Sequence, residues 1–358
     1  MFIFRSELLF SFFISLYVLF VSLIGEGSGK VFSYQILIWF FEGFIVSSFI
    51  YYFNEKVLRK DFEVSIVLVG LLASFITIIM IISPTMNAFI STKIVNIVET
   101  ELLPGQRIAT RGFALAESPM GTYGTIQGLI AVILLNNRKK GNYLWLFLPV
   151  LIISIIFNQR LGLFIFLGGV ILLFFFESKK KRMIVPIFFF IGFIYIMLPW
   201  LRRFSEVTYY WILYPFYLFF GGLENLDSPY IFNNTVSQLA QNELHFPETL
   251  FGKIFGEGAY IYSDIIRSSD IGYVNYIYIG GALMILLLII FQIYMYKRYK
   301  RAVSKDIMPL FITIIVFVIT FKGLYMFWPG GLSRLIVMLY AYAILKRYNL
   351  KKNELCVE

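Results

Sequence analysis

The sequence predicts an all-α polytopic membrane protein with about ten transmembrane helices. Hydrophobic residues make up 59% of the 358 residues and aromatic residues 19%, and the mean hydropathy is +0.79. A soluble globular domain is only about half apolar, so this composition excludes a water-soluble fold. Apolar runs of roughly 17–25 residues, the length that an α-helix needs to cross a bilayer, recur along the chain.

The predicted spans lie at residues 8–24, 31–53, 62–83, 113–135, 142–158, 161–176, 184–200, 272–296, 307–327 and 332–346. The first run is long and lacks a small-residue cleavage site, so we expect it to be retained as a span rather than removed as a leader. Neither an internal repeat of 20–50 residues nor a Pro- or Ser-rich linker divides the chain. We therefore expect one transmembrane domain over residues 1–358.

The distribution of charge predicts the orientation. The formal net charge is +10, from 31 basic and 21 acidic residues. Most of the basic residues lie near the two chain ends and in the turns that follow even-numbered spans, such as residues 179–182 and 297–305. The positive-inside rule places these turns and both termini in the cytoplasm. Because the charge is explained as an orientation signal, we expect no nucleic-acid partner.

Two segments on the opposite, extracytoplasmic side are long, residues 84–112 and residues 201–271, the latter before the eighth span. The first repeats apolar residues at helical spacing between two prolines, which predicts an amphipathic helix lying on the membrane. The second contains an apolar stretch at residues 209–222 that Pro215 interrupts. A full span there would move the basic residues 297–305 outside, so we expect an interfacial or re-entrant segment.

The cysteine and histidine content excludes several chemistries. The chain has one cysteine, Cys356, and one histidine, His245. An intramolecular disulfide, a cysteine-rich metal cluster and a polyhistidine metal site therefore cannot form. His245 lies in the long extracytoplasmic loop, where a solvated loop histidine and a functional histidine are both open.

Charged residues within or beside the spans are the functional candidates, because an ionisable group at membrane depth is costly unless it is paired or hydrated. They are Glu42, Arg111, Glu117, Arg160, Asp264, Arg267, Asp270, Lys322 and Arg334. Asp264, Arg267 and Asp270 are three residues apart and share one face of a helical segment. For Glu42, a structural pair or a buried protonated carboxyl is the alternative to catalysis. The glycines Gly121, Gly124 and Gly128 predict a close helix-packing face.

Arg160 lies at the tip of a short hairpin. Its two helices are about 16 residues long, or roughly 24 Å, against an apolar bilayer core of roughly 30 Å. We therefore expect the tip to lie below the outer surface, where Arg160 can meet a ligand anion; snorkelling, or pairing with Glu117, is the alternative. Arginine grips phosphate oxygens with a planar fork. Glu117, Asp264 and Asp270 offer Mg²⁺ ligands, but without a DxD-like pair we expect arginine to replace the metal.

Three stretches carry a family resemblance. ATRGFALAESP at Ala109–Pro119, NQRLGL at Asn158–Leu163 and SSDIGYVNYIYIGG at Ser268–Gly281 resemble, in this order, motifs of the O-antigen and capsule polymerase (Wzy) family. The chain has Gln159 where serine is usual, and the order Glu-Ser-Pro at residues 117–119. The related O-antigen ligases commonly have histidine and asparagine where Ser269 and Asp270 stand here, which favours a polymerase.

The resemblance implies a metal-independent glycosyltransferase of GT-C-like architecture, without cofactor, in the bacterial inner membrane. Its donor and acceptor would be undecaprenyl-diphosphate-linked oligosaccharides, its further partners membrane lipid and a chain-length regulator, and its product a lipopolysaccharide or capsule polymer. We expect catalytic roles for Asp270, Glu117 and Arg267, diphosphate binding by Arg160, Arg111 and Arg334, and glycan binding by Asp264, His245 and Tyr273. The alternatives are an O-antigen ligase and a lipid-linked oligosaccharide flippase or other transporter.

Overall fold

The computed structural model describes residues 2–25, 27–54, 61–90, 93, 123–137, 143–158, 160–176, 181–204, 209, 244–259, 269, 271–303, 306–323, 326–327 and 330–355. Over these residues the chain is helical and forms no strand. They group into two compact units, residues 1–60 with 234–358 as unit 1 and residues 61–233 as unit 2. The single domain over residues 1–358 stays a prediction.

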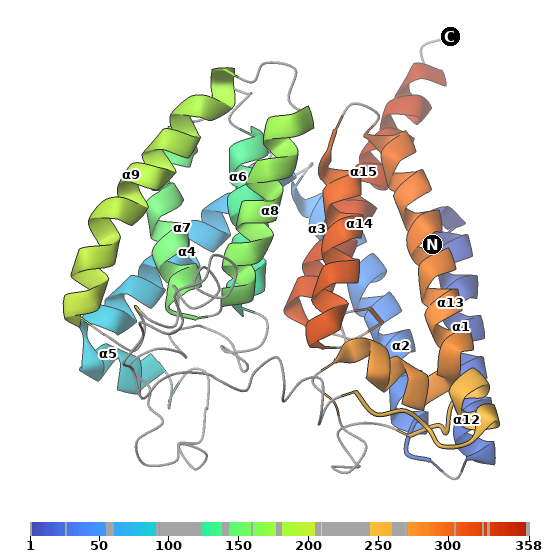
Figure 1. The fold of residues 1–358 in the computed structure, drawn as a ribbon. Coiled ribbons are helices and arrows are strands. Elements are labelled where there is room, and N and C mark those ends of the chain that lie inside the picture. The colour runs from blue at the N-terminus through green and yellow to red at the C-terminus, as the bar shows by residue number, and fades with distance from the viewer. Residues whose placement is uncertain are drawn as a thin grey trace. The chain divides into compact units, whose positions relative to one another are not determined.

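Unit 1 joins the two ends of the chain. Its helices are α1 (Arg5–Ile24), α2 (Lys30–Phe40), the π-helical turn η2 (Phe41–Val46), α3 (Ser47–Phe53), α12 (Leu250–Phe255), α13 (Gly272–Ala302), α14 (Met308–Ile319), η11 (Thr320–Lys322) and α15 (Gly331–Leu355). In Figure 1, α1 in blue runs beside α13 in orange, and α12 lies at one end of this pair. Residues more than 200 positions apart in sequence are thereby brought into contact.

Unit 2 is built from the middle of the chain. Its helices are α4 (Phe62–Ile82), α5 (Pro84–Phe89), α6 (Gly124–Asn137), η8 (Tyr143–Phe147), α7 (Leu148–Ile156), α8 (Arg160–Phe176) and α9 (Lys181–Phe204). The predicted interfacial helix begins as α5, where Ser83 accepts a hydrogen bond from the backbone N–H of Met86 at 3.3 Å and Pro84 occupies the first turn. Most of the segment 91–122 lies outside the described residues.

Within the described residues a helix overlaps each of the ten predicted ranges, and four helices are long and apolar enough to cross a membrane: Arg5–Ile24, Lys30–Phe53, Phe62–Ile82 and Gly272–Ala302. Shorter apolar helices lie at Gly124–Asn137, Tyr143–Ile156, Leu161–Phe176 and Met308–Lys322. The all-helical class and the membrane-spanning character are thus supported. The number of ten spans and their orientation stay predictions.

Glycines bring α6 and α8 into backbone contact, as the glycine pattern predicted. A methyl group added at Gly128 would lie 2.3 Å from the carbonyl oxygen of Gly162, and one added at Gly162 would lie 2.0 Å from that of Gly124. Only glycine allows such an approach of two helices. The contact joins the first residues of α6 and α8, so Arg160, which begins α8, is two residues from it. Gly121 lies in the part of the chain that is not described.

A fully buried carboxylate ties three helices of unit 1 together. The Glu7 side chain on α1 has no exposed surface, forms an ion pair with Arg298 of α13 and accepts a hydrogen bond from the hydroxyl of Tyr340 on α15. Arg298 also donates to the backbone carbonyl of Ile3. A buried charge is tolerated only when it is paired and hydrogen-bonded in this way.

Candidate functional site

The long helix α13 is broken in its interior at the pair Gly280–Gly281. Gly280 has φ −151° and ψ 21°, and Gly281 has φ 66° and ψ −168°, neither of which is helical. A break removes intrahelical hydrogen bonds, which in a membrane must be replaced by other protein groups. The third resemblance stretch, Ser268–Gly281, thus ends at a break within α13 rather than in a regular helix.

The replacement partners come from α1 and from the segment after α12. The carbonyl of Tyr278 accepts hydrogen bonds from the N–H of Glu257 at 2.9 Å and of Ala259 at 3.3 Å. The hydroxyl of Tyr17 on α1 contacts two carbonyl oxygens, that of Gly280 at 2.8 Å and that of Phe255 at 3.0 Å. The break is therefore bonded to neighbouring elements on two sides.

Glycine contacts hold residues 256–258 against the end of α1 and against the break in α13. Gly258, at φ 64°, accepts a hydrogen bond through its carbonyl from the N–H of Gly29 at 2.6 Å. A methyl group added at Gly27 would lie 2.1 Å from the same carbonyl oxygen, and one at Gly25 would lie 2.1 Å from that of Glu257. Gly25 and Gly27 therefore meet Glu257 and Gly258 backbone to backbone.

A second polar contact fixes the turn that leads into α13. The side chain of Asn275 donates to the carbonyl of Ser269 at 2.6 Å and accepts from its N–H at 3.1 Å. The hydroxyl of Ser269 accepts from the N–H of Ile271 at 3.0 Å. Both residues that flank Asp270 are thus anchored at the N-terminus of a helix, where the helix dipole favours negative charge. Asp270 itself lies outside the described residues.

His245 contacts the same half of α13. Its Nδ1 lies 3.1 Å from the hydroxyl of Tyr278, and the two rings are 5.4 Å apart between centroids. Tyr278 packs with Val274, Ala259 and the partly buried Ile271 in one apolar cluster. Residues 244–247 and 256–259, together with Ser269 and Ile271, therefore contact the N-terminal half of α13. Asp264 and Arg267, which belong to the stretch between residues 259 and 269, lie outside the described residues.

Tyr273 packs towards α14. Its hydroxyl donates to the carbonyl of Phe317 at 2.8 Å, and its ring is 4.8 Å from that of Phe321. The adjoining Gly272 touches the end of the same helix, since an added methyl group would lie 2.0 Å from the carbonyl oxygen of Gly323. These contacts give Tyr273 a packing role; glycan binding by Tyr273 stays a prediction.

Arg334 forms an ion pair with Glu42. Its Nε and Nη2 donate to the same carboxylate oxygen, Oε2, at 2.9 and 2.6 Å. Glu42 lies in the π-helical turn η2, whose Gly43 packs against Val337 of α15. The structural-pair interpretation of Glu42 therefore holds. The side chains are 44% and 39% exposed, and Nη1 of Arg334 takes no part in the pair. The structure does not test diphosphate binding by Arg334.

The remaining candidates belong to unit 2. The backbone of Arg160 forms the first turn of α8, next to the start of α6. Arg111 and Glu117, which precede α6 in sequence, lie in the part of the chain that is not described. Within the described residues, no group of three or more histidine, cysteine, aspartate or glutamate side chains could hold a metal ion. Since Glu117, Asp264 and Asp270 are not among them, the expected absence of a metal stays untested.

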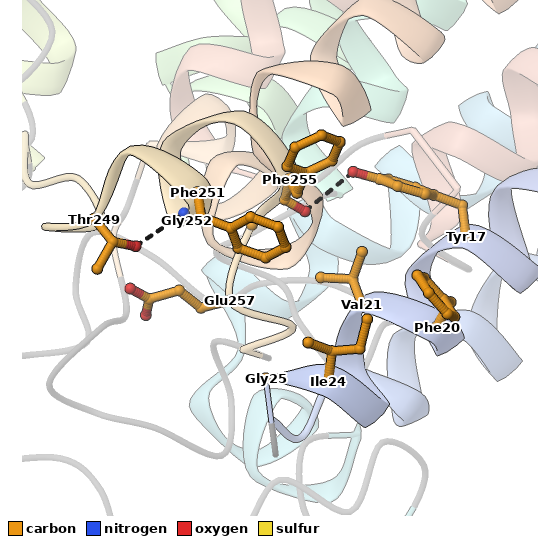
Figure 2. Close-up of a pocket in the computed structure, with 11 residues that line it drawn as sticks. Tyr17, Phe20, Val21, Ile24, Gly25, Thr249, Phe251, Gly252, Phe255 and Glu257 are labelled. Carbon is orange, nitrogen blue, oxygen red and sulfur yellow. Dashed lines mark hydrogen bonds between the residues drawn. The ribbon is translucent and has the colours of Figure 1, made fainter.

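The sequence analysis missed a groove between α1 and α12, here called the α1–α12 groove. Its volume is about 560 Å³, and it is lined by residues that include Phe20, Ile24, Thr249, Phe251, Phe255 and Glu257. Figure 2 shows residues of α1 as one wall and residues of α12 as the other. Thr249 caps α12 by accepting from the N–H of Gly252 at 2.9 Å. Thr249 before the sequence LFGKIF, with Gly256 directly after it, was the available signal for this short helix.

Comparison with family models, with curated proteins and with solved structures finds no match for this chain.

Proposed function

We propose that the chain is a polysaccharide polymerase that joins undecaprenyl-diphosphate-linked oligosaccharide repeat units on the outer face of the bacterial inner membrane. The proposal includes the ten-span arrangement of GT-C-like architecture, with both termini in the cytoplasm. It depends on the resemblance of three sequence stretches to the O-antigen and capsule polymerases. The four helices that are long and apolar enough to cross a membrane are compatible with it.

One observation supports the proposal most. Residues 244–247 and 256–259, together with Ser269, are anchored on the N-terminal half of α13 by the His245–Tyr278, Glu257–Tyr278 and Ser269–Asn275 hydrogen bonds. The chain thus fixes Ser269 and Ile271, the two neighbours of Asp270, at the start of α13. Enzymes hold catalytic groups in this manner, because misplacement by about 1 Å can cost two orders of magnitude in rate.

In the proposed reaction, a sugar hydroxyl of the acceptor attacks the anomeric carbon of the donor. The new glycosidic bond forms while the bond from that carbon to the diphosphate oxygen breaks, and the undecaprenyl diphosphate departs. Asp270 or Glu117 takes the hydroxyl proton, and Arg267 orients the carboxylate. Arg160, Arg111 and Arg334 stabilise the negative charge that develops on the diphosphate.

Arg160 provides the sharpest test of one residue. Losing a preorganised contact to a developing charge lowers the rate by roughly 10²–10³-fold. Arg160→Ala should therefore abolish long polymer in cells at a normal protein level, whereas Arg203→Ala, at an exposed position on α9, should leave the polymer length unchanged. Full-length polymer from Arg160→Ala would remove this residue from the site.

Deleting the gene separates the proposed classes. Loss of a polymerase leaves single repeat units on the lipid carrier or on lipid A. Loss of a flippase retains the repeats on the cytoplasmic side, and loss of a ligase leaves finished polymer unattached. The ligase is the second candidate, because His245 is held against Tyr278 of α13 rather than left in a solvated loop. Accumulation of unattached polymer would favour the ligase and reject the polymerase.

A further inference from the structure

The α1–α12 groove opens onto the exposed apolar face of α1. Phe20 and Ile24, which line it, are 62% and 55% exposed, and Phe251 of α12 is 56% exposed. On α1, Phe13 and Leu23 are also exposed. Because Arg5–Ile24 is long and apolar enough to span a membrane, we take this surface to be the one that faces lipid. The groove continues it, so its apolar walls are within reach of bilayer lipid.

The walls are preformed. The Tyr17 hydroxyl connects the backbone at the end of α12 to the break in α13, and the glycine contacts fix residues 256–258 against the end of α1. A cavity held open by backbone contacts does not need to be ordered when a ligand enters, which lowers the cost of binding. The groove therefore has the properties of a built site for an apolar chain.

One carboxylate distinguishes this groove from plain lipid-facing surface. Glu257 lines it between Gly256 and Gly258, both at positive φ, and its backbone N–H is bonded to Tyr278. Its side chain passes beside Gly252, since a methyl group added there would lie 3.2 Å from Cγ of Glu257. Figure 2 shows the carboxylate on the α12 side, near Thr249. An ionisable group at a membrane boundary is a functional candidate by default.

We infer that the α1–α12 groove is a binding site for a bilayer phospholipid with a primary ammonium head group, such as phosphatidylethanolamine. An acyl chain occupies the apolar walls formed by Phe20, Ile24, Phe251 and Phe255, and the ammonium group pairs with Glu257. A head group with only negative charge would bring like charges together and binds less well. The site is independent of the proposed glycosyl transfer.

Photo-crosslinking tests the inference on the purified full chain in nanodiscs. The probes are phosphatidylethanolamine and phosphatidylglycerol with the same diazirine-bearing acyl chain, and labelled peptides are mapped by mass spectrometry. We expect the ethanolamine probe to label residues 17–25 and 249–257, with a preference over the glycerol probe of roughly two- to fivefold, the range of a partly exposed ion pair. Labelling that is spread evenly over the lipid-facing helices would overturn the inference.

Neighbouring residues supply matched controls. Ile24→Trp fills the groove and should lower labelling at least about fivefold, whereas Leu23→Trp, one residue away and outside the groove, should not. If Ile24→Trp does not fold, Phe251→Ala with Leu250→Ala as its control repeats the comparison on α12, because Phe251 lines the groove and Leu250 does not. Equal labelling within either pair would refute the location.

The head-group assignment has its own test. Glu257→Gln should keep acyl-chain labelling in the groove but lose the preference for the ethanolamine probe. Glu248→Gln, at an exposed position just before α12, should retain the preference. A preference that survives in Glu257→Gln, or stronger labelling by a polyprenyl-phosphate probe than by the ethanolamine probe, would overturn the assignment.

Discussion

Replacing Arg298 with glutamine should destabilise the protein far more than the same change at Arg334. Both arginines pair with a glutamate in unit 1, but the pairs differ in burial. The Glu7 side chain has 0% exposed surface and its partner Arg298 has 25%, whereas Glu42 and Arg334 are 39% and 44% exposed. Breaking a buried pair from one side leaves an uncompensated charge and typically costs about 3–5 kcal/mol. An exposed pair contributes about 0–1 kcal/mol.

The free energy of unfolding, measured by denaturant titration of the purified protein in mild detergent, checks this prediction. Arg298→Gln should lower it by about 3–5 kcal/mol and Arg334→Gln by no more than about 1 kcal/mol. The double variant Glu7→Gln/Arg298→Gln should recover much of the loss, because it removes the stranded charge. Equal losses in the two single variants, or no recovery in the double variant, would refute the reasoning from burial.

Three further predictions test the local geometry. Gly281→Ala places a side chain at φ 66° and ψ −168°, a conformation that essentially only glycine adopts and that costs about 1–3 kcal/mol in backbone strain alone. It should lower the midpoint of thermal unfolding, while Gly168→Ala, with open space in α8, should not. Asn275→Ala removes both hydrogen bonds to Ser269 and should lower the free energy of unfolding by about 1–3 kcal/mol. Because this turn holds the two neighbours of Asp270, the variant should also shorten the polymer. A polymer of unchanged length would show that the turn has no part in catalysis. Gly162→Val should separate α6 from α8 and reduce the yield of folded protein by size-exclusion chromatography, and a normal yield would contradict the close contact.

The sequence predicted the helices well because hydrophobic run length is a local property. Within the described residues a helix overlaps each predicted span, and the Gly124 and Gly128 spacing predicted the packing face that contacts Gly162. The pairing of Glu42 also followed from a general rule, that a carboxylate inside a span needs a partner. Its partner Arg334 is 292 residues away, so the sequence alone could not identify it.

What the sequence could not predict depends on contacts between distant segments. In sequence, the pair Gly280–Gly281 is compatible either with a close helix–helix contact or with a break in the helix. The structure shows the break through the non-helical φ and ψ angles of both glycines, and it places the carbonyl of Ile254 directly against Gly281. Likewise, Glu257 stood out only after α12 and α1 were seen to form a groove around it. The turn at Asn275 and Ser269 was invisible for the same reason, since an asparagine in an apolar helix has no fixed partner in sequence.

The most direct test of the proposed function is a polymerisation assay with purified protein in liposomes that contain undecaprenyl-diphosphate-linked repeat units. The account predicts a ladder of products that grows by one repeat at a time without added metal, and a loss of roughly 10²–10³-fold in rate for Asp270→Asn or for Arg160→Ala. A wild-type protein that yields no product longer than one repeat, or a ladder that both variants leave unchanged, would contradict it.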